Sequence, residues 1–350
     1  MSEDRAEQAF RTALANRATE YQPRTMDLPS PQRGRRWTAM LVAAVLIVAA
    51  ILVGAFRPHG HQEVPSPAGL PTGWRWESYR DVMVGVPDTW GYAIAPAQGG
   101  WCAGEAYPPA QGYVDTANAY SSSTLVLCGG TPPAQAFAPH LSFVEGRSNA
   151  LALPSDWTTR ARSFGAVRVE VTVRKSQTFV AAAILATAHA VSEDQNGCAV
   201  SSPIQDQLVG RPSPPFDVSS VHRLDSIAVC QYKLDVSGPG LLASQLLTGG
   251  SAQAELAAIQ GAAVRSGPDR GHGCSPADRG ETGISLILKT GSRTHEMYAF
   301  YSGCTRNGFD DGTNIRELTT DNCPTLFDPR IVETEGIRRA FERCTAPEKH

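Results

Sequence analysis

One uncharged stretch near the N-terminus constrains the fold of this chain more than any other feature of its sequence. The 20 residues Trp37–Phe56 contain no charged side chain. At about 1.5 Å of rise per residue, a helix of this length reaches roughly 30 Å, the thickness of the hydrocarbon core of a bilayer. A signal peptide cleaved after Ala55 is the alternative, but its apolar core would be shorter and closer to the N-terminus. We therefore expect a retained transmembrane helix over 37–56.

The charges on either side of this stretch predict its orientation. Arg33, Arg35 and Arg36 precede it, whereas Arg57 stands alone after it. Lys and Arg next to a span resist translocation. We expect a single-pass protein of the cell membrane that contacts the lipid bilayer through 37–56, with a cytoplasmic N-terminus and an extracytoplasmic C-terminal region.

The cysteines support the same orientation. All eight follow the apolar stretch, and an even set on the translocated side is typical of disulfides in an oxidising compartment. Zinc is the alternative, but no Cys-x-x-Cys occurs, so we expect neither a metal nor a cofactor. The sequence leaves the connectivity open, and the simplest prediction pairs neighbours: Cys102 with Cys128, Cys198 with Cys230, Cys274 with Cys304, and Cys323 with Cys344.

The charge of the outer region excludes one class of partner. Residues 57–350 carry 24 Lys plus Arg against 29 Asp plus Glu, a net charge of −5. This net charge argues against a general electrostatic attraction to nucleic acid or to anionic lipid. We expect no nucleic-acid partner.

The cytoplasmic tail contains one candidate interaction segment. Residues 2–22 place Ala, Leu, Phe and Tyr at helical spacing, which predicts a short amphipathic helix followed by a disordered tether. The helix is either a solvated element or a docking face for a cytoplasmic partner.

Composition shifts along the chain predict its domain organisation. We expect a cytoplasmic tail (1–36), the transmembrane helix (37–56), a Pro/Gly linker (57–73), a first extracytoplasmic α+β domain (74–192), a linker (193–217) and a second extracytoplasmic α+β domain (218–345).

Hydrophobic periodicity supports this α+β fold class in both outer domains. Four valines alternate with polar residues over 166–175, which predicts a half-buried strand, and the Ala-rich 176–191 predicts a helix. In the second domain we expect strands over 226–235 and 240–247, then a helix that begins at Ser251 as its N-cap. A hairpin over 283–303, a loop over 307–314 and a short helix over 333–344 complete the prediction.

No assembled catalytic motif occurs, so we do not expect an enzyme. Lys289–Gly291 matches the Lys-Thr-Gly element of penicillin-binding proteins, but no Ser-x-x-Lys accompanies it, so a hairpin turn is favoured. His295 begins a His-Glu-x-x-His pattern that ends in Ala299 and lacks the second zinc ligand. Asp310–Asn314 could offer oxygens to calcium, but a plain turn is favoured because the spaced ligands are missing.

Tryptophans offer the best candidate binding surface. Five of them fall in the first outer domain, where they either pack in the core or form a surface that stacks on sugars or peptides. These residues are Trp74, Trp76, Trp90, Trp101 and Trp157.

The chain resembles single-pass membrane proteins of actinobacteria that carry a cysteine-containing extracytoplasmic region. The Arg-bearing tail, the Ala/Val-rich span, "YRDVMVGVPDTWG" and "IAVCQY" carry this resemblance. It implies no established activity. Our hypothesis is a membrane-anchored binding or sensing protein for a cell-envelope ligand; the alternatives are an envelope hydrolase whose site forms only in three dimensions and a membrane-tethered regulator acting through its cytoplasmic tail.

Overall fold

The computed structural model describes residues 69–96, 108, 110–116, 132–146, 152–206, 210–270, 273–275, 277–328 and 330–331. All of them belong to one compact unit, Pro67–His350. The predicted tail, transmembrane helix and final helix (333–344) lie outside the described residues, so they stay predictions. Within the described ranges, no helix has the length and apolar composition that crossing a membrane would require. The predicted division of the outer region into two domains also stays a prediction.

The first sheet has three antiparallel strands in the order β1-β2-β8. A tight turn joins β1 to β2, and Arg80 occupies a left-handed conformation in that turn, with φ of 54°. The valines that alternate along β2 (Val82, Val84 and Val86) are fully buried. The bounds are β1 Trp74–Tyr79, β2 Val82–Pro87 and β8 His189–Ala190.

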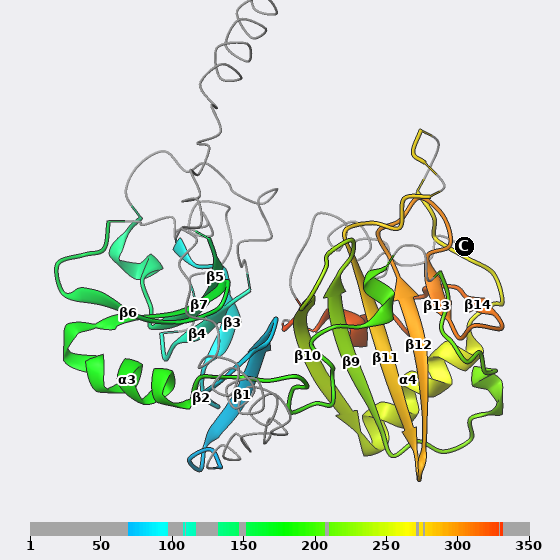
Figure 1. Ribbon diagram of the computed structural model, residues 1–350, viewed down its shortest axis with the longest axis horizontal. Coiled ribbons are helices and arrows are strands. Elements are labelled where there is room, and N and C mark those ends of the chain that lie inside the picture. Colours follow the sequence, from blue (N-terminus) through cyan, green and yellow to red (C-terminus); the bar gives the residue numbers. More distant parts are fainter. Residues whose placement is uncertain are drawn as a thin grey trace, which may run out of the picture. The chain divides into compact units, whose positions relative to one another are not determined.

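The second sheet has five strands in the order β3-β4-β5-β7-β6 and carries helix α3 (Figure 1). The strand predicted over 166–175 is confirmed as β7: its four alternating valines are at most 2% exposed. Helix α3, also predicted, packs against β7, β6 and β2. The bounds are β3 Gly91–Ala93, β4 Tyr113–Asp115, β5 His140–Glu145, β6 Trp157–Phe164, β7 Val167–Arg174 and α3 Thr178–Thr187.

The third sheet has six antiparallel strands in the order β10-β9-β11-β12-β13-β14, with helix α4 packed against β10 and β9. The predicted strands and the hairpin around Gly291 are confirmed. The bounds are β9 Ser226–Lys233, β10 Leu241–Thr248, α4 Gly249–Gly261, β11 Thr282–Thr290, β12 Arg293–Phe300, β13 Gly308–Asp310 and β14 Ile315–Arg316. The 3-10 helices are η3 Ala134–Ala136, η4 Lys175–Gln177, η5 Pro203–Gln205, η6 Val218–Ser220 and η7 Pro324–Phe327.

Two predictions in this sheet are wrong in detail. Helix α4 begins at Gly249 with Thr248 as its N-cap, and the Ser251 hydroxyl donates back to the Thr248 carbonyl at 2.8 Å. The loop predicted over 307–314 contains a strand, because β13 pairs with the edge of β12 before the chain turns. Turn residues such as Gly308 and Gly312 hid this pairing in the sequence.

The fold is therefore mixed and rich in sheet. One apolar cluster contains buried residues from all three sheets, including Val84, Val171 and Leu242. A second cluster surrounds Cys230 and Tyr232, whose side chains alternate along β9 with those of the first cluster. Strand β9 is consequently buried on both faces, which explains its nearly continuous apolar sequence.

Candidate functional site

The predicted disulfides are confirmed where the structure describes both cysteines. Cys198 is bonded to Cys230 and Cys274 to Cys304, in each case the predicted nearest neighbour. Cys323 is disulfide-bonded as well. The three other cysteines (Cys102, Cys128 and Cys344) lie outside the described residues. These bridges indicate an oxidising, extracytoplasmic compartment for the folded part of the chain.

The described tryptophans of the predicted binding surface lie in different environments. Trp90 and Trp157 are each only 5% exposed, so their faces are not available for stacking on a ligand. Trp74 and Trp76 are half-buried on β1, where the Trp76 ring meets His189 edge-on at 5.2 Å between centroids. Trp101 lies outside the described ranges. Whether Trp74 and Trp76 bind a ligand stays a prediction.

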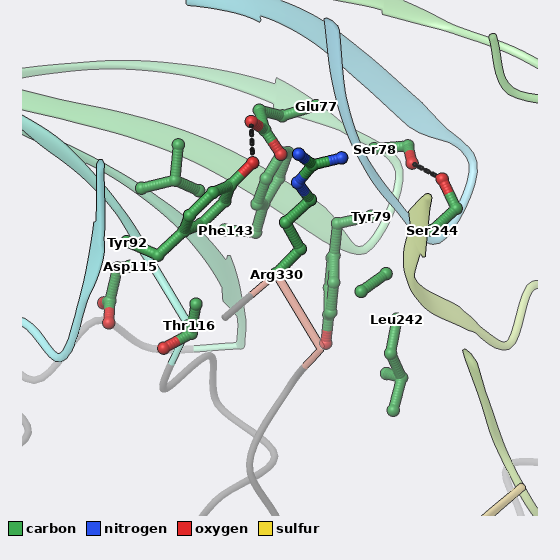
Figure 2. Close-up of a pocket in the computed structure, with 12 residues that line it drawn as sticks. Glu77, Ser78, Tyr79, Tyr92, Asp115, Thr116, Phe143, Leu242, Ser244 and Arg330 are labelled. Atoms are coloured by element: carbon green, nitrogen blue, oxygen red, sulfur yellow. Dashed lines mark hydrogen bonds between the residues drawn. The ribbon is translucent and has the colours of Figure 1, made fainter. Parts of the chain in front are cut away.

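A small polar cavity lies where β1 meets strands of the other two sheets. It encloses about 30 Å³, which is room for about two water molecules. We call it the junction cavity. Figure 2 shows its lining, which includes Glu77, Ser78, Tyr79, Tyr92, Asp115, Thr116, Phe143, Leu242, Ser244 and Arg330.

Glu77 is one of two acids that line the junction cavity. Its carboxylate accepts hydrogen bonds from Tyr92 Oη at 2.7 Å and from Arg75 Nε at 2.7 Å. Burial raises the pKa of Glu77, and the positive charge of Arg75 opposes that rise. The opposite carboxylate, Asp115, accepts from Ser142 Oγ at 2.8 Å and from the backbone N–H of Ala95 at 3.1 Å. Both acids are therefore engaged in hydrogen bonds that hold neighbouring strands together.

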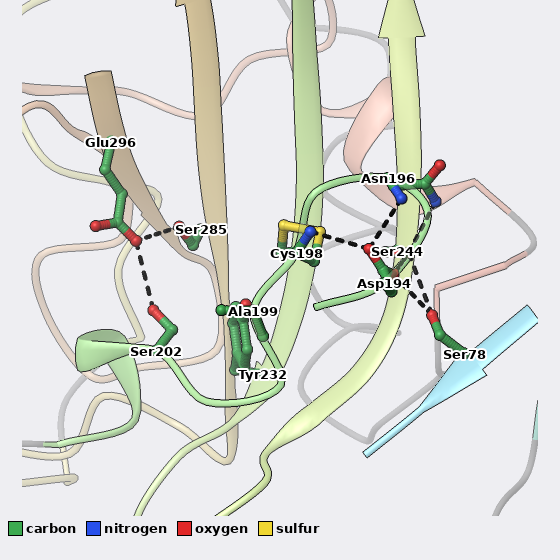
Figure 3. Close-up of a disulfide and its surroundings, with 11 residues drawn as sticks. Ser78, Asp194, Asn196, Cys198, Ala199, Ser202, Tyr232, Ser244, Ser285 and Glu296 are labelled. Atoms are coloured by element: carbon green, nitrogen blue, oxygen red, sulfur yellow. Dashed lines mark hydrogen bonds between the residues drawn. A yellow bond between two sulfur atoms is a disulfide. The ribbon is translucent and has the colours of Figure 1, made fainter. Parts of the chain in front are cut away.

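A buried carboxylate next to this cavity connects three distant segments (Figure 3). Asp194 accepts hydrogen bonds from the hydroxyls of Ser78 on β1, at 2.8 Å, and of Ser244 on β10. Its other oxygen accepts from the backbone N–H groups of Asn196, at 3.0 Å, and Cys198, at 2.9 Å. Four donors thus compensate the burial of this acid, which is 5% exposed.

A larger, open groove lies beside residues 201–206, which follow Asp194 in the chain. Its volume is about 760 Å³, and three serines and two aspartates are among the residues of η5, the β9–β10 turn and their neighbours that line it: Ser201, Ser202, Pro203, Gln205, Asp206, Asp235, Val236, Ser237 and Gly238. Burial raises the pKa of Asp235, the positive charge of Arg279 opposes this rise, and Asp206 adds to it. The groove therefore presents oxygen atoms and negative charge to solvent.

Buried contacts hold one wall of the groove in place. The Gln205 side chain donates to the Gly238 carbonyl at 3.1 Å and accepts from the Ser202 N–H at 2.8 Å. Tyr232 Oη donates to the Ala199 carbonyl at 2.6 Å. We call residues 194–206 the linking segment, because it carries Asp194 at one end and the groove at the other.

The motifs that resemble catalytic elements have structural roles. Lys289 and Thr290 end strand β11, and Gly291 begins the turn to β12, so the tripeptide belongs to the predicted hairpin. His295 lies on β12 and stacks on Phe216 at 4.7 Å. Asp310 pairs with Arg211 at 2.7 Å, and Asp311 accepts from the backbone of Thr313 and Asn314, which is the predicted turn.

In the part of the chain that the structure describes, no group of three metal-ligating side chains comes together, and no serine hydroxyl is hydrogen-bonded to a histidine. Sequence reasoning missed the Asp194 network and the groove, because no motif spacing marks either of them. Comparison of the chain with protein-family models, with curated proteins and with solved structures found no match.

Proposed function

We propose that this chain is a membrane-anchored extracytoplasmic binding or sensing protein whose ligand occupies the open groove. The observation that best supports this function is the linking segment, which joins the groove to the Asp194 network. The disulfides support the extracytoplasmic part of the proposal, and the uncharged run 37–56 supports the anchor.

The chemistry of the groove indicates the class of ligand. Serine hydroxyls and two carboxylates favour a hydroxyl-rich or amine-bearing molecule, such as a fragment of the cell wall. An open groove excludes little water, so we expect reversible binding of moderate affinity rather than deep enclosure.

The linking segment offers a route from binding to a change in the fold. A ligand that moves η5 displaces residues bonded through Cys198 to β9 and through Asp194 to Ser78. Strand β1 would then shift against β10, and the junction cavity would respond. A sensor needs such coupling, since binding in the groove must change the conformation of an element, here β1, that also contacts a second site.

Calorimetric titration of the full chain in detergent micelles with soluble peptidoglycan fragments tests the proposal. We expect saturable binding that weakens at least about tenfold when Asp206→Asn and Asp235→Asn are combined, because both carboxylates face the ligand. Asp321→Asn, an exposed carboxylate in another part of the fold, is the matched control and should leave the affinity unchanged.

Two outcomes would contradict the proposed function. If the variant with Asp206→Asn and Asp235→Asn binds the fragments as tightly as the wild type does, the groove is not the binding site. The second outcome is cleavage of the titrated fragments by the wild type, which mass spectrometry would detect. Cleavage would favour the hydrolase alternative over a binding protein.

A further inference from the structure

Helix α3 carries an apolar face that the described fold leaves uncovered. Its ten residues, Thr178–Thr187, include no charged side chain. Ala181 and Ile184 are buried against the neighbouring strands. Phe179 is 71% exposed, and Ala182, Ala183 and Ala186 are exposed at the matching helical spacing. A surface helix of a soluble domain normally turns charged residues to this side.

Basic side chains border this apolar face. Arg160 and Arg162 lie opposite Val171 and Val169 in the β6–β7 register, so they share the side of the sheet that α3 covers (Figure 1). Arg162 reaches the end of α3, where it donates to the Ala188 carbonyl at 3.0 Å. Lys175 is exposed just before the other end of the helix.

The local charge differs in sign from that of the whole outer region. Residues 157–190 contain five Lys or Arg and a single acid, Glu170. Glu170 pairs with Arg168 at 2.5 Å, and both alternate with the buried valines of β7, so they face away from α3. The border of the α3 face is therefore positively charged although residues 57–350 are negative overall.

We propose that the α3 face docks on the surface of an anionic bilayer, with Phe179 in the headgroup region and Arg160, Arg162 and Lys175 beside lipid phosphates. An apolar helical face bordered by Lys and Arg is the pattern of helices that lie in a membrane interface. The inference rests on the anchor of the proposed function.

The anchor makes such docking favourable even with a small contact. Residues 57–68 connect the predicted span to Gly69, and 12 residues reach at most about 40 Å when fully extended. With the anchor in the bilayer, this tether would limit the distance of the folded unit from the lipid surface and raise the effective concentration of that surface. A short helix with one large apolar side chain can then dock without binding free vesicles strongly.

Fluorescence quenching by doxyl-labelled lipid tests the inference on the full chain. Phe179→Trp and, as a matched control, Val264→Trp, which replaces another exposed apolar residue (59% exposed), are reconstituted in phosphatidylcholine vesicles with or without phosphatidylglycerol. We expect the signal of the tryptophan added by Phe179→Trp to be quenched at least about twofold more than that of the control in the anionic vesicles only. Combining Phe179→Trp with Arg160→Gln and Lys175→Gln, or adding salt, should abolish the difference.

Equal quenching of the two tryptophan variants would overturn the inference. Protection of the Phe179→Trp side chain that grows with protein density and does not depend on lipid charge would also overturn it, because a second copy would then cover the face. Alkaline carbonate extraction of the same vesicles separates the two proposals. Loss of the chain from the bilayer overturns the anchor and this inference together, whereas retention without quenching overturns the docking alone.

Discussion

A buried acid on α4 is the residue that we expect to dominate the pH dependence of stability. Glu255 is 2% exposed, and neither of its carboxylate oxygens makes a hydrogen bond of normal geometry to a described residue. Burial raises its pKa to about 7, and the nearby Thr325 opposes that rise. The native state therefore favours the protonated acid.

The sign of the resulting pH effect follows from this shift. The folded pKa of about 7 lies above the ordinary glutamate value of 4.5, so the contribution of Glu255 to stability is complete below about pH 4.5 and is lost as the pH rises towards 7 and above. At roughly 1.4 kcal/mol per pKa unit, this loss amounts to about 3 kcal/mol.

Glu255→Gln removes this titration without changing the size of the side chain. We expect the variant to be more stable than the wild type at pH 8 by about 1 to 3 kcal/mol, and to gain nothing at pH 4.5. Urea unfolding at the two pH values measures the difference. Glu281→Gln, at an exposed position, is the control, and a pH-independent effect of Glu255→Gln would contradict the expectation.

Among the residues where the sheets meet, we expect substitution of Asp194 to lower the free energy of unfolding most. Asp194→Ala leaves the Ser78 and Ser244 hydroxyls and two backbone N–H groups without their shared acceptor. We expect a loss of about 3 to 5 kcal/mol in the free energy of unfolding, measured by urea denaturation at pH 7. Asp194→Asn keeps one acceptor oxygen and should lose less.

The neighbouring Glu193→Gln is the control for Asp194, because its side chain is exposed. A loss below about 1 kcal/mol for Asp194→Ala would show that the four hydrogen bonds contribute little net stability. It would also weaken the proposed coupling between the groove and β1.

At the scale of elements, the two disulfides offer a matched comparison. The bridges span 32 and 30 residues, so the chain-entropy model gives almost the same stabilisation for both, about 3.5 to 4 kcal/mol. Cys198 and Cys230 are fully buried, however, whereas Cys274 is partly exposed. Removing the first bridge therefore also leaves a cavity in the second apolar cluster.

We expect the pair Cys198→Ala and Cys230→Ala to destabilise the fold by about 1 to 2 kcal/mol more than the pair Cys274→Ala and Cys304→Ala. Thermal and urea unfolding of the two double variants measure this difference. Equal losses would mean that chain entropy accounts for both bridges and that the buried sulfur atoms add no packing energy.

The elements also show what could be predicted from the sequence. Strand β7 was predictable because Val167, Val169, Val171 and Val173 follow a strict period of two, and α3 because its segment is rich in Ala. The start of α4 was not, since Ser251 is a good N-cap residue but Thr248 already has the extended conformation that begins the helix. Local propensity was overridden there by the pairing of β10.

The candidate site was beyond sequence reasoning for a different reason. Ser78 and Asp194 are 116 residues apart, and Ser244 is a further 50 residues along the chain. None of them belongs to a motif, and only the meeting of β1, the linking segment and β10 brings them together. The tryptophans were visible in the sequence, but composition cannot distinguish a buried ring such as Trp157 from a stacking surface.

At the scale of the whole molecule, the arginines before residue 37 and the cysteines after residue 101 predict one topology from unrelated physical causes. Positive charge acts on insertion, whereas disulfide formation depends on the redox state of the compartment that the folded part enters. The two causes can therefore be tested separately, because the folded part can be kept in the reducing cytoplasm while its cysteines stay unchanged.

Deletion of 37–56 should leave the remaining chain in the reducing cytoplasm. We then expect Cys198, Cys230, Cys274 and Cys304 to react with a thiol-alkylating mass tag under denaturing conditions, whereas the same cysteines of the full chain stay unreactive because they are bridged. Deletion of 2–22, which keeps the three arginines and the apolar run, is the control and should leave the bridges intact. Bridges that form equally in both deletion variants would contradict the topology, because oxidation would then not depend on translocation through this segment.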